Sequence, residues 1–229
     1  MHYNHNLSAF KNKHLKQSAV VFGTGPTLSK FSEEDVGDWE NCIKIGVNSM
    51  VYHEKMHLDY YFCGHDASKE SWHYHNQLKR TLLDQIIHRS DIGQVFCATR
   101  VNGQPNRYHF SDQESKAMGA INYGISSNSG HEHIKKDIDL HDLYNHSIIF
   151  SSLQFALYTG VEKIFLVGCD CGGGFSFMFP EKKFVSSEAR SIHRHWLEFE
   201  KFSSQHYPDV EILSIRPVGL KGLFGEKKT

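Results

Sequence analysis

The sequence predicts an α/β protein with a doubly wound, mainly parallel sheet. Short β-branched and apolar runs predict buried strands, segments with helical spacing of apolar residues lie between them, and glycine or polar residues directly follow several of the runs. The chain has 229 residues, of which 39% are hydrophobic and 22% charged, which suffices for one such domain with a sizeable core.

The chain begins with a polar stretch, and the first apolar run follows it. We expect residues 1–16 to form a flexible N-terminal arm and residues 17–229 to form a single Rossmann-like domain. The first strand is predicted at residues 18–22, where β-branched residues cluster. It ends in a glycine turn that opens a helix-compatible segment, Gly23-Thr24-Gly25-Pro26-Thr27-Leu28.

Strands and helices alternate along the rest of the chain. Further strands are predicted at residues 42–47, 58–63, 94–98, 163–167 and 210–215. Helices are predicted at residues 69–88, 151–158 and 188–206. Residues 100–147 are rich in glycine, asparagine and serine, and we expect an irregular excursion there, either with short strands or forming a lid.

Four of the predicted strands end in glycine or polar residues. The ends are Gly23-Thr24-Gly25, Asn48-Ser49, Gly64-His65-Asp66 and Gly168-Cys169-Asp170. In a doubly wound sheet the ligand lies beyond the carboxyl ends of the strands, so these residues should converge on one crevice. A glycine turn before a helix is typical of phosphate binding, and the crevice is therefore a candidate nucleotide site.

The residues of the glycine turn and of the next strand end argue against several nucleotides that proteins of this fold class commonly bind. Leu28 stands where the dinucleotide fingerprint requires its third glycine, and Asn48 stands where it requires an acidic residue, which disfavours NAD and S-adenosylmethionine. No P-loop is present. The net charge of -1 provides no basic field for nucleic acid.

Composition also bears on location and metal content. No apolar run predicts a membrane span, and no signal peptide is evident, so we expect a cytoplasmic protein. The five cysteines fall in or after predicted strands and indicate buried thiols in a reducing compartment. The 17 histidines lack a zinc-protease spacing, and no metal site is expected.

Four segments resemble two related protein families. The opening Gly23–Leu28 resembles the G-x-G-P-S-L start of the bacterial sialyltransferases of glycosyltransferase family forty-two and of the motility-associated-factor and hydroxymethylpterin-pyrophosphokinase-like proteins. The segment Gly46–Ser49 is similar to the end of their second strand, and Ser151–Asp170 is similar to their serine, helix and strand block. The fourth match is the terminal helix and strand around Leu197–Phe199 and Ile212–Pro217.

The resemblance implies a CMP-activated sugar donor and a glycan or other hydroxyl acceptor. Family members invert configuration with a histidine base, need no metal or other obligatory cofactor and often assemble, which implies a homo-oligomer. By position, the ribose-phosphate would lie against Gly23, Thr24, Gly25, Pro26 and Thr27. Asn48 would hydrogen-bond the phosphate or sugar, and the cytidine would be flanked by Ser151 or Ser152 and by Gly168, Cys169 and Asp170.

The catalytic groups depart from the family pattern. The family's base precedes the last helix, where this chain has residues 185–190, so the candidates are His193, if the alignment slips by one turn, and Glu188. An alternative interpretation makes His193 and His195 a pair on the helix surface. Phenylalanines stand where the family has tyrosines, at positions Phe175, Phe177 and Phe179.

Three functions therefore remain open from the sequence. The first is a glycosyltransferase that uses a nucleotide-activated, CMP-linked sugar. The second is a Mg-ATP-dependent pyrophosphokinase-like enzyme, in which Asp66 and Asp170 would hold the Mg²⁺. The third is a non-catalytic protein on a degenerate transferase fold, since fold alone does not specify chemistry.

Overall fold

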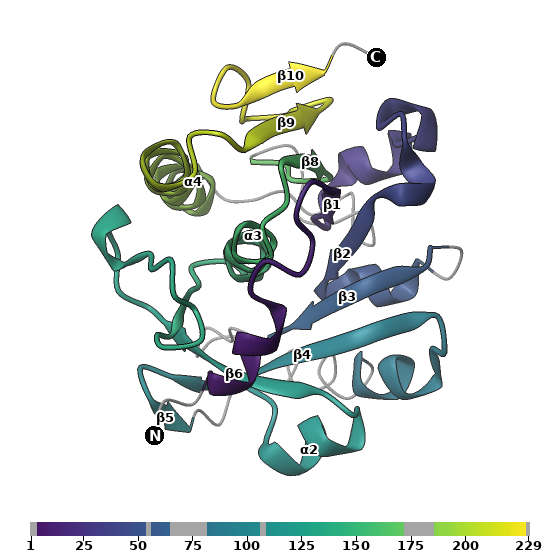
Figure 1. Ribbon diagram of the computed structural model, residues 1–229, viewed down its shortest axis with the longest axis vertical. Helices are drawn as coiled ribbons and strands as arrows, with labels where there is room; N and C mark the ends of the chain where they lie inside the picture. The colour runs from purple at the N-terminus through teal and green to yellow at the C-terminus, as the bar shows by residue number, and fades with distance from the viewer. Residues whose placement is uncertain (1–3, 54–55, 65–81, 106–108, 172–185, 228–229) are drawn as a thin grey trace.

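The computed structural model describes residues 4–53, 56–64, 82–105, 109–171 and 186–227. They form one open sheet of ten strands in the order β10-β9-β8-β1-β2-β3-β4-β6-β7, with β5 attached to β4 (Figure 1). The β4–β5 pair is antiparallel, and all other pairs are parallel. This confirms the predicted α/β fold with a doubly wound, mainly parallel sheet.

The predicted strands occur close to their expected bounds. The strands are β1 Ser18–Phe22, β2 Ile43–Val47, β3 Leu58–Cys63, β4 Ile92–Val101, β5 Gln104–Pro105, β6 Ile121–Ser126, β7 Leu143–Tyr144, β8 Lys163–Val167, β9 Glu211–Ile215 and β10 Gly225–Lys227. The fourth strand is longer than predicted because it also pairs with β6, which the sequence did not reveal.

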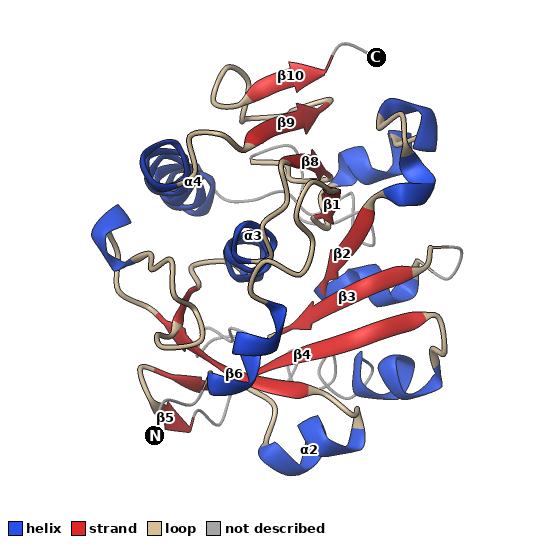
Figure 2. Cartoon of the chain, in the orientation of Figure 1, coloured by secondary structure: helices blue, strands red, loops and turns tan. Residues whose placement is uncertain are grey.

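Helices cover both faces of the sheet (Figure 2). In the described part of the chain, the α-helices include α2 Asp112–Ala117, α3 Ile148–Tyr158 and α4 Ser186–His206. The short 3-10 helices are η1 His5–Phe10, η2 Pro26–Lys30, η3 Glu33–Asp35, η4 Trp39–Asn41, η5 Asn48–Tyr52 and η7 His131–His133. Residues 82–88 are also helical, and the rest of the helix predicted at 69–88 lies outside the described residues. No helix in the described ranges combines the length and apolarity that crossing a membrane requires.

The sheet separates two hydrophobic cores. Along β1, Ala19 and Val21 face the core that includes η1, α3 and α4, whereas Val20 and Phe22 face the core beneath η2 to η5 and α2. All eleven residues of α3 are buried, because this helix crosses the middle of the sheet from β7 to β8. Burial on every side explains why α3 has no polar face and begins earlier than the predicted residues 151–158.

The N-terminal segment packs on the sheet, in contrast to the flexible arm expected for residues 1–16. In its described part, Leu7 is fully buried and Phe10 is nearly so. Phe10 makes edge-to-face contacts at centroid distances of 5.2 to 5.8 Å with three rings, those of Tyr60, Phe96 and Phe155. Two apolar residues at helical spacing in a polar context are therefore sufficient to anchor this segment.

Asn4 attaches the same segment to the edge of the sheet that contains β6 and β7. Its side-chain oxygen accepts a hydrogen bond from the Gly124 amide at 2.6 Å, and its side-chain nitrogen donates to the His141 carbonyl at 2.6 Å. The buried amide side chain thus satisfies backbone groups of β6 and of the segment before β7, as a neighbouring strand would.

Residues 100–147 contain the expected short strands, but these strands extend the sheet and do not form a lid. β6 pairs with β4 and β7 pairs with β6, and Tyr123 in β6 is fully buried. Asn122 and Gly124 are residue types common in turns, yet both belong to β6. Glycine is required at position 124, because a Cβ there would lie 2.3 Å from Oδ1 of Asp142.

We expect Phe10→Ala to lower the free energy of unfolding by about 3 to 5 kcal/mol, because it removes a buried ring from three aromatic contacts. Chemical denaturation of the purified protein measures this change. Leu15→Ala is the control, because Leu15 in the same segment is 61% exposed and should change stability by less than about 0.5 kcal/mol. Equal effects of the two substitutions would show that the segment is not anchored.

Candidate functional site

The carboxyl ends of the central strands lie side by side, as predicted. In the register of the sheet, Phe22 at the end of β1 is paired with Val167 of β8 and with Gly46 of β2. The strand order reverses at β1, since later strands are added on one side through β2 and on the other through β8. Crevices at such a reversal are the usual ligand sites of open α/β sheets.

The turn after β1 lies directly against the turn after β8. The Gly23 amide donates to the Val167 carbonyl at 2.8 Å, and the Gly25 amide donates to the Gly168 carbonyl at 2.7 Å. A Cβ at Gly23 would lie 2.4 Å from the Gly168 oxygen, and Gly168 itself has a φ of +63°. Only glycine permits this approach and this backbone conformation, so the two turns form one rigid unit.

Asp170 binds the start of η2 and thereby closes the glycine turn. Its carboxylate accepts from the Thr27 amide at 2.8 Å and from the Thr27 hydroxyl at 2.6 Å, and a Cβ at Gly25 would lie 2.4 Å from Oδ2. Pro26, half-buried at the first position of η2, has no amide hydrogen to offer. The helix N-terminus that we expected to face a phosphate therefore already carries a carboxylate.

Burial raises the pKa of the Asp170 carboxyl, and the two hydrogen bonds from Thr27 oppose that shift. Both carboxylate oxygens are engaged by the protein, which leaves Asp170 poorly placed as the Mg²⁺ ligand of the pyrophosphokinase alternative. Asp66, the other expected ligand, lies outside the described residues. In the described part of the chain, no group of three or more histidine, cysteine or acidic side chains is arranged to hold a metal ion.

Asn48 provides a hydrogen-bond donor beside the glycine turn. It directly follows β2, which pairs with β1, and it has a φ of +42°, a conformation that asparagine tolerates better than most residues. Its Oδ1 accepts from the Gly64 amide at 3.3 Å, and its carbonyl accepts from the Tyr61 hydroxyl at 2.5 Å. The bond from Gly64 orients the side chain, and its Nδ2 has no hydrogen-bond partner among the described residues.

Ser151 and Ser152 lie inside the core. Both are fully buried in the first turns of α3. The Ser151 hydroxyl donates to the carbonyl of Tyr144, in the edge strand β7, at 3.3 Å, and the Ser152 hydroxyl donates to the Ile149 carbonyl at 2.8 Å. Their hydroxyls thus satisfy backbone carbonyls inside the core.

The remaining predicted residues lie directly after β8 and on α4. Cys169 follows Gly168 at the turn, and burial raises the pKa of its thiol to about 12, so it is protonated at neutral pH. His193 is half-buried on α4. Glu188 belongs to the first turn of the same helix, but its side chain lies outside the described residues.

His195 is buried, contrary to its interpretation as half of a surface pair with His193. Residues two apart on a helix point about 200° apart, and His195 faces the core, where it is 2% exposed. Its Nδ1 lies 2.6 Å from the Tyr144 hydroxyl and 3.0 Å from Oε2 of Glu198. Its ring stacks on that of His146 at a centroid distance of 3.7 Å and an interplanar angle of 6°.

The hydrogen-bond pattern fixes the tautomer of His195. Oε2 of Glu198 accepts from the Tyr144 hydroxyl, from His195 and from the Gly130 amide, and together these bonds outweigh burial and lower the pKa of Glu198. Since the single tyrosine hydrogen goes to the carboxylate, the hydrogen on the imidazole is assigned to Nδ1. The neutral imidazole therefore keeps its lone pair on Nε2.

This cluster was not predicted from the sequence. His195 and Glu198 have a helical i,i+3 spacing, which was the available signal, but Tyr144 and His146 lie in the segment that was interpreted as irregular. The cluster joins α4 to the segments before and after β7, because Gly130 and His146 belong to those segments.

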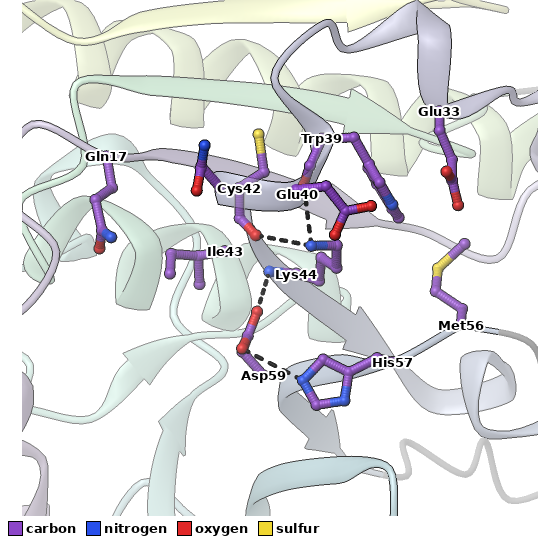
Figure 3. A pocket seen from close by; sticks show the side chains of 11 residues that line it. Gln17, Glu33, Trp39, Glu40, Cys42, Ile43, Lys44, Met56, His57 and Asp59 are labelled. Carbon is purple, nitrogen blue, oxygen red and sulfur yellow. Dashed lines mark hydrogen bonds and ion pairs between the residues drawn. The ribbon is translucent and has the colours of Figure 1, made fainter.

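A pocket of about 510 Å³ lies at the opposite edge of the sheet, at the amino ends of β1 to β3 (Figure 3). Within it, the Lys44 ammonium donates to the carbonyls of Trp39 at 3.0 Å and of Cys42 at 3.1 Å. The Asp59 carboxylate accepts from the Lys44 amide at 2.8 Å and pairs with His57 at 3.5 Å. These polar groups satisfy one another, so the carboxyl edge remains the candidate functional site.

We expect Gly25→Ala to lower the free energy of unfolding by about 3 kcal/mol, because the added Cβ would overlap the Asp170 carboxylate. Gly25 has a φ of -67°, so the backbone itself tolerates alanine and the cost is steric. Gly222→Ala is the control, because open space surrounds Gly222 and only its φ of +75° opposes alanine, at about 1 kcal/mol. Denaturant titration measures both, and an equal or smaller loss at Gly25 would contradict the close contact.

We expect the buried His195 to make stability depend on pH. Burial lowers its pKa, while the hydrogen bond that its Nδ1 donates to Glu198 acts in the opposite direction. The unfolded chain then binds the proton more tightly, so this contribution is present above about pH 6.5 and is lost as the pH falls through the folded pKa.

Unfolding free energies measured from about pH 7 to pH 5 test this expectation in the wild type and in His195→Asn, which keeps a donor for Glu198. The wild type should lose more stability on acidification than the variant. Parallel curves for the two proteins would contradict the assignment of a neutral imidazole to the folded state.

Comparison with known proteins bears on the fold. No protein-family model matches the sequence, and no curated protein matches it. Among solved structures, the MAf glycosyltransferase from Magnetospirillum magneticum AMB-1 aligns over 93% of this chain with a TM-score of 0.55 and 9% sequence identity. The alignment covers 35% of that protein, so this chain spans about a third of its length.

A second solved structure is the sialyltransferase CstII from Campylobacter jejuni, in complex with a substrate analogue, cytidine-5'-monophosphate. It aligns over 93% of this chain and 86% of its own, with a TM-score of 0.48 and 11% identity. The alignment with the MAf protein shows that this chain shares its fold with part of that protein.

Proposed function

We propose that this protein is a glycosyltransferase that uses a nucleotide-activated sugar, and that the donor is CMP-linked. The observation that carries the proposal is the side-chain Nδ2 of Asn48, which has no partner in the described part of the chain and lies beside the glycine turn at the strand reversal of a fold shared with a glycosyltransferase. Similarity of fold and sequence alone would suggest only a family. The Asn48 side chain adds a hydrogen-bond donor at the edge of the sheet where a nucleotide phosphate would bind.

The donor phosphate is bound by a side chain more than by a helix N-terminus. Asp170 already caps η2, so an anion at this edge receives its directed hydrogen bond from Asn48 Nδ2. The buried glycines Gly23 and Gly25 let the ribose approach the backbone, and the half-buried Thr24 lies between them. The four sequence segments that resemble the bacterial sialyltransferases are our reason for proposing a cytidine donor.

Transfer requires a base that takes the proton of the acceptor hydroxyl. As that proton leaves, the acceptor oxygen bonds to the anomeric carbon from the opposite face, and the bond from this carbon to the phosphate oxygen breaks. The nucleotide departs with the bonding electrons, which inverts the configuration. We assign the base to His193, because it is the half-exposed imidazole on α4, whereas His195 is packed in the core.

Isothermal titration with CMP, CDP, UDP and ATP, each with and without Mg²⁺, tests the donor class. We expect CMP to bind without Mg²⁺ and more tightly than the other nucleotides. Binding of ATP alone, dependent on Mg²⁺, would overturn the proposal in favour of the pyrophosphokinase-like enzyme. Absence of binding by every cytidine nucleotide would also overturn it.

Asn48→Asp is the sharpest variant, because it keeps the acceptor for the Gly64 amide and replaces the free donor with a negative charge. We expect it to weaken CMP binding by roughly 10- to 100-fold, the cost of a lost hydrogen bond to a charged group. Asn102→Asp is the matched control, since Asn102 also has a left-handed backbone, with a φ of +49°, and should leave binding unchanged. Equal affinity of the Asn48 variant and the wild type would exclude Asn48 from the site.

His193→Ala should slow hydrolysis or transfer of a CMP-sugar by about 10²- to 10⁴-fold while CMP binding persists. His206→Ala, at the exposed end of the same helix, is the control. If the wild type binds CMP but turns over no donor during long incubation, the non-catalytic alternative is correct.

A further inference from the structure

We infer that Arg216 is a positioning residue that holds η2, and with it the glycine turn, in the conformation that receives the donor. This inference rests on the proposed donor site at the carboxyl edge. It assigns a role to Arg216, which lies in the matching segment Ile212–Pro217 but was not among the expected site residues.

Arg216 stands at the same edge as the glycine turn. It directly follows β9, whose Ser214 is paired with Leu166 of β8, so Arg216 continues the register next to Gly168. The segment after it also packs on the turn after β8, because the Cys171 amide donates to the Val218 carbonyl at 2.8 Å. The carboxyl ends of β1, β8 and β9 are therefore adjacent.

The backbone of Arg216 is unusual for its residue type. Its φ of +51° is in the left-handed region, which residues other than glycine, asparagine and aspartate rarely adopt. Such a conformation persists when surrounding contacts determine it, and the contacts here are made by the guanidinium. Outliers of this kind cluster at functional sites, which directs attention to what the side chain holds.

The guanidinium holds the C-terminal end of η2. It donates to the carbonyl of Lys30, the last residue of η2, and a second nitrogen donates to Oδ1 of Asp35 at 3.0 Å. Asp35 is 5% exposed, and its other oxygen accepts from the Ser32 amide at 2.9 Å. A planar fork satisfies the carbonyl and the carboxylate together, which a lysine ammonium does less well.

Both ends of η2 are thus held by residues that follow neighbouring strands. Asp170, after β8, accepts from Thr27 at the start of the helix, and Arg216, after β9, donates to Lys30 at its end. A five-residue 3-10 helix has little stability of its own. Leu28 packs the middle of η2 into the core, but without Arg216 the helix loses the polar contact that holds its C-terminal end. The Gly23–Gly25 turn at its other end then becomes less ordered, which costs donor affinity.

Arg216→Gly tests the inference, because glycine accepts the left-handed backbone and the substitution removes the side chain that carries the guanidinium. Amide hydrogen exchange over residues 24–31 should be faster than in the wild type, while exchange in α3 stays unchanged. CMP affinity should fall by roughly 10-fold, the order expected for a lost charged hydrogen bond, and methylguanidinium added to the variant should restore it. Lys221→Ala, which removes an exposed cation of the same segment, should change none of these.

A companion variant separates positioning from a general loss of stability. Arg216→Gly leaves the buried carboxylate of Asp35 unpaired, so Asp35→Asn is added to it, since asparagine still accepts from Ser32. The double variant should regain stability but retain fast exchange and weak CMP binding. Wild-type exchange over residues 24–31 in Arg216→Gly would overturn the inference, and this readout requires no nucleotide. Failure of the wild type to bind CMP would overturn the proposed function and leave the exchange test intact.

Discussion

The close contact between the backbone turns after β1 and β8 is the constraint on which the carboxyl edge depends. A Cβ at Gly23 would overlap the Gly168 carbonyl, and one at Gly25 would overlap the Asp170 carboxylate. With no side chains between them, the turns share two hydrogen bonds and bring Asp170 within reach of Thr27. The start of η2 is thereby placed by β8, although the two segments are more than a hundred residues apart in sequence.

The same central strands explain why the ends of the chain must pack on the sheet. A parallel sheet buries both faces, and α3 covers only part of one of them. The N-terminal segment covers a further part with Leu7 and Phe10, and α4 covers the rest with Trp196 and Phe199. The sheet beneath the site is consequently covered by three helical segments, η1, α3 and α4, which are far apart in the sequence. None of them forms the glycine turn itself.

The central strands could be predicted because each is a continuous apolar run whose signal is local. β6 could not, because Asn122 and Gly124 resemble turn residues. Asn122 is explained by its contacts with Ser115 and Asp112, and Gly124 by its contacts with Asp142 and Asn4. The candidate site likewise has one part that could be predicted from the sequence and another that could not. The glycine turn is a local motif and was predicted, whereas the bond between Asp170 and Thr27, and the packing of His195 against β7, join distant segments that no local pattern connects.

The Asp170 carboxylate, bound to the start of η2, affects how an anion would be recognised at this edge of the sheet. A phosphate at a free helix N-terminus is held by several backbone amides, and such a site distinguishes poorly between one phosphate ester and another. Here Asp170 engages the Thr27 amide, so its charge would repel a phosphate placed at that amide. An anion bound at this edge, as the proposed function requires, would lie toward the side-chain amide of Asn48. Selectivity would then depend more on contacts to the base and the sugar than on the phosphate itself.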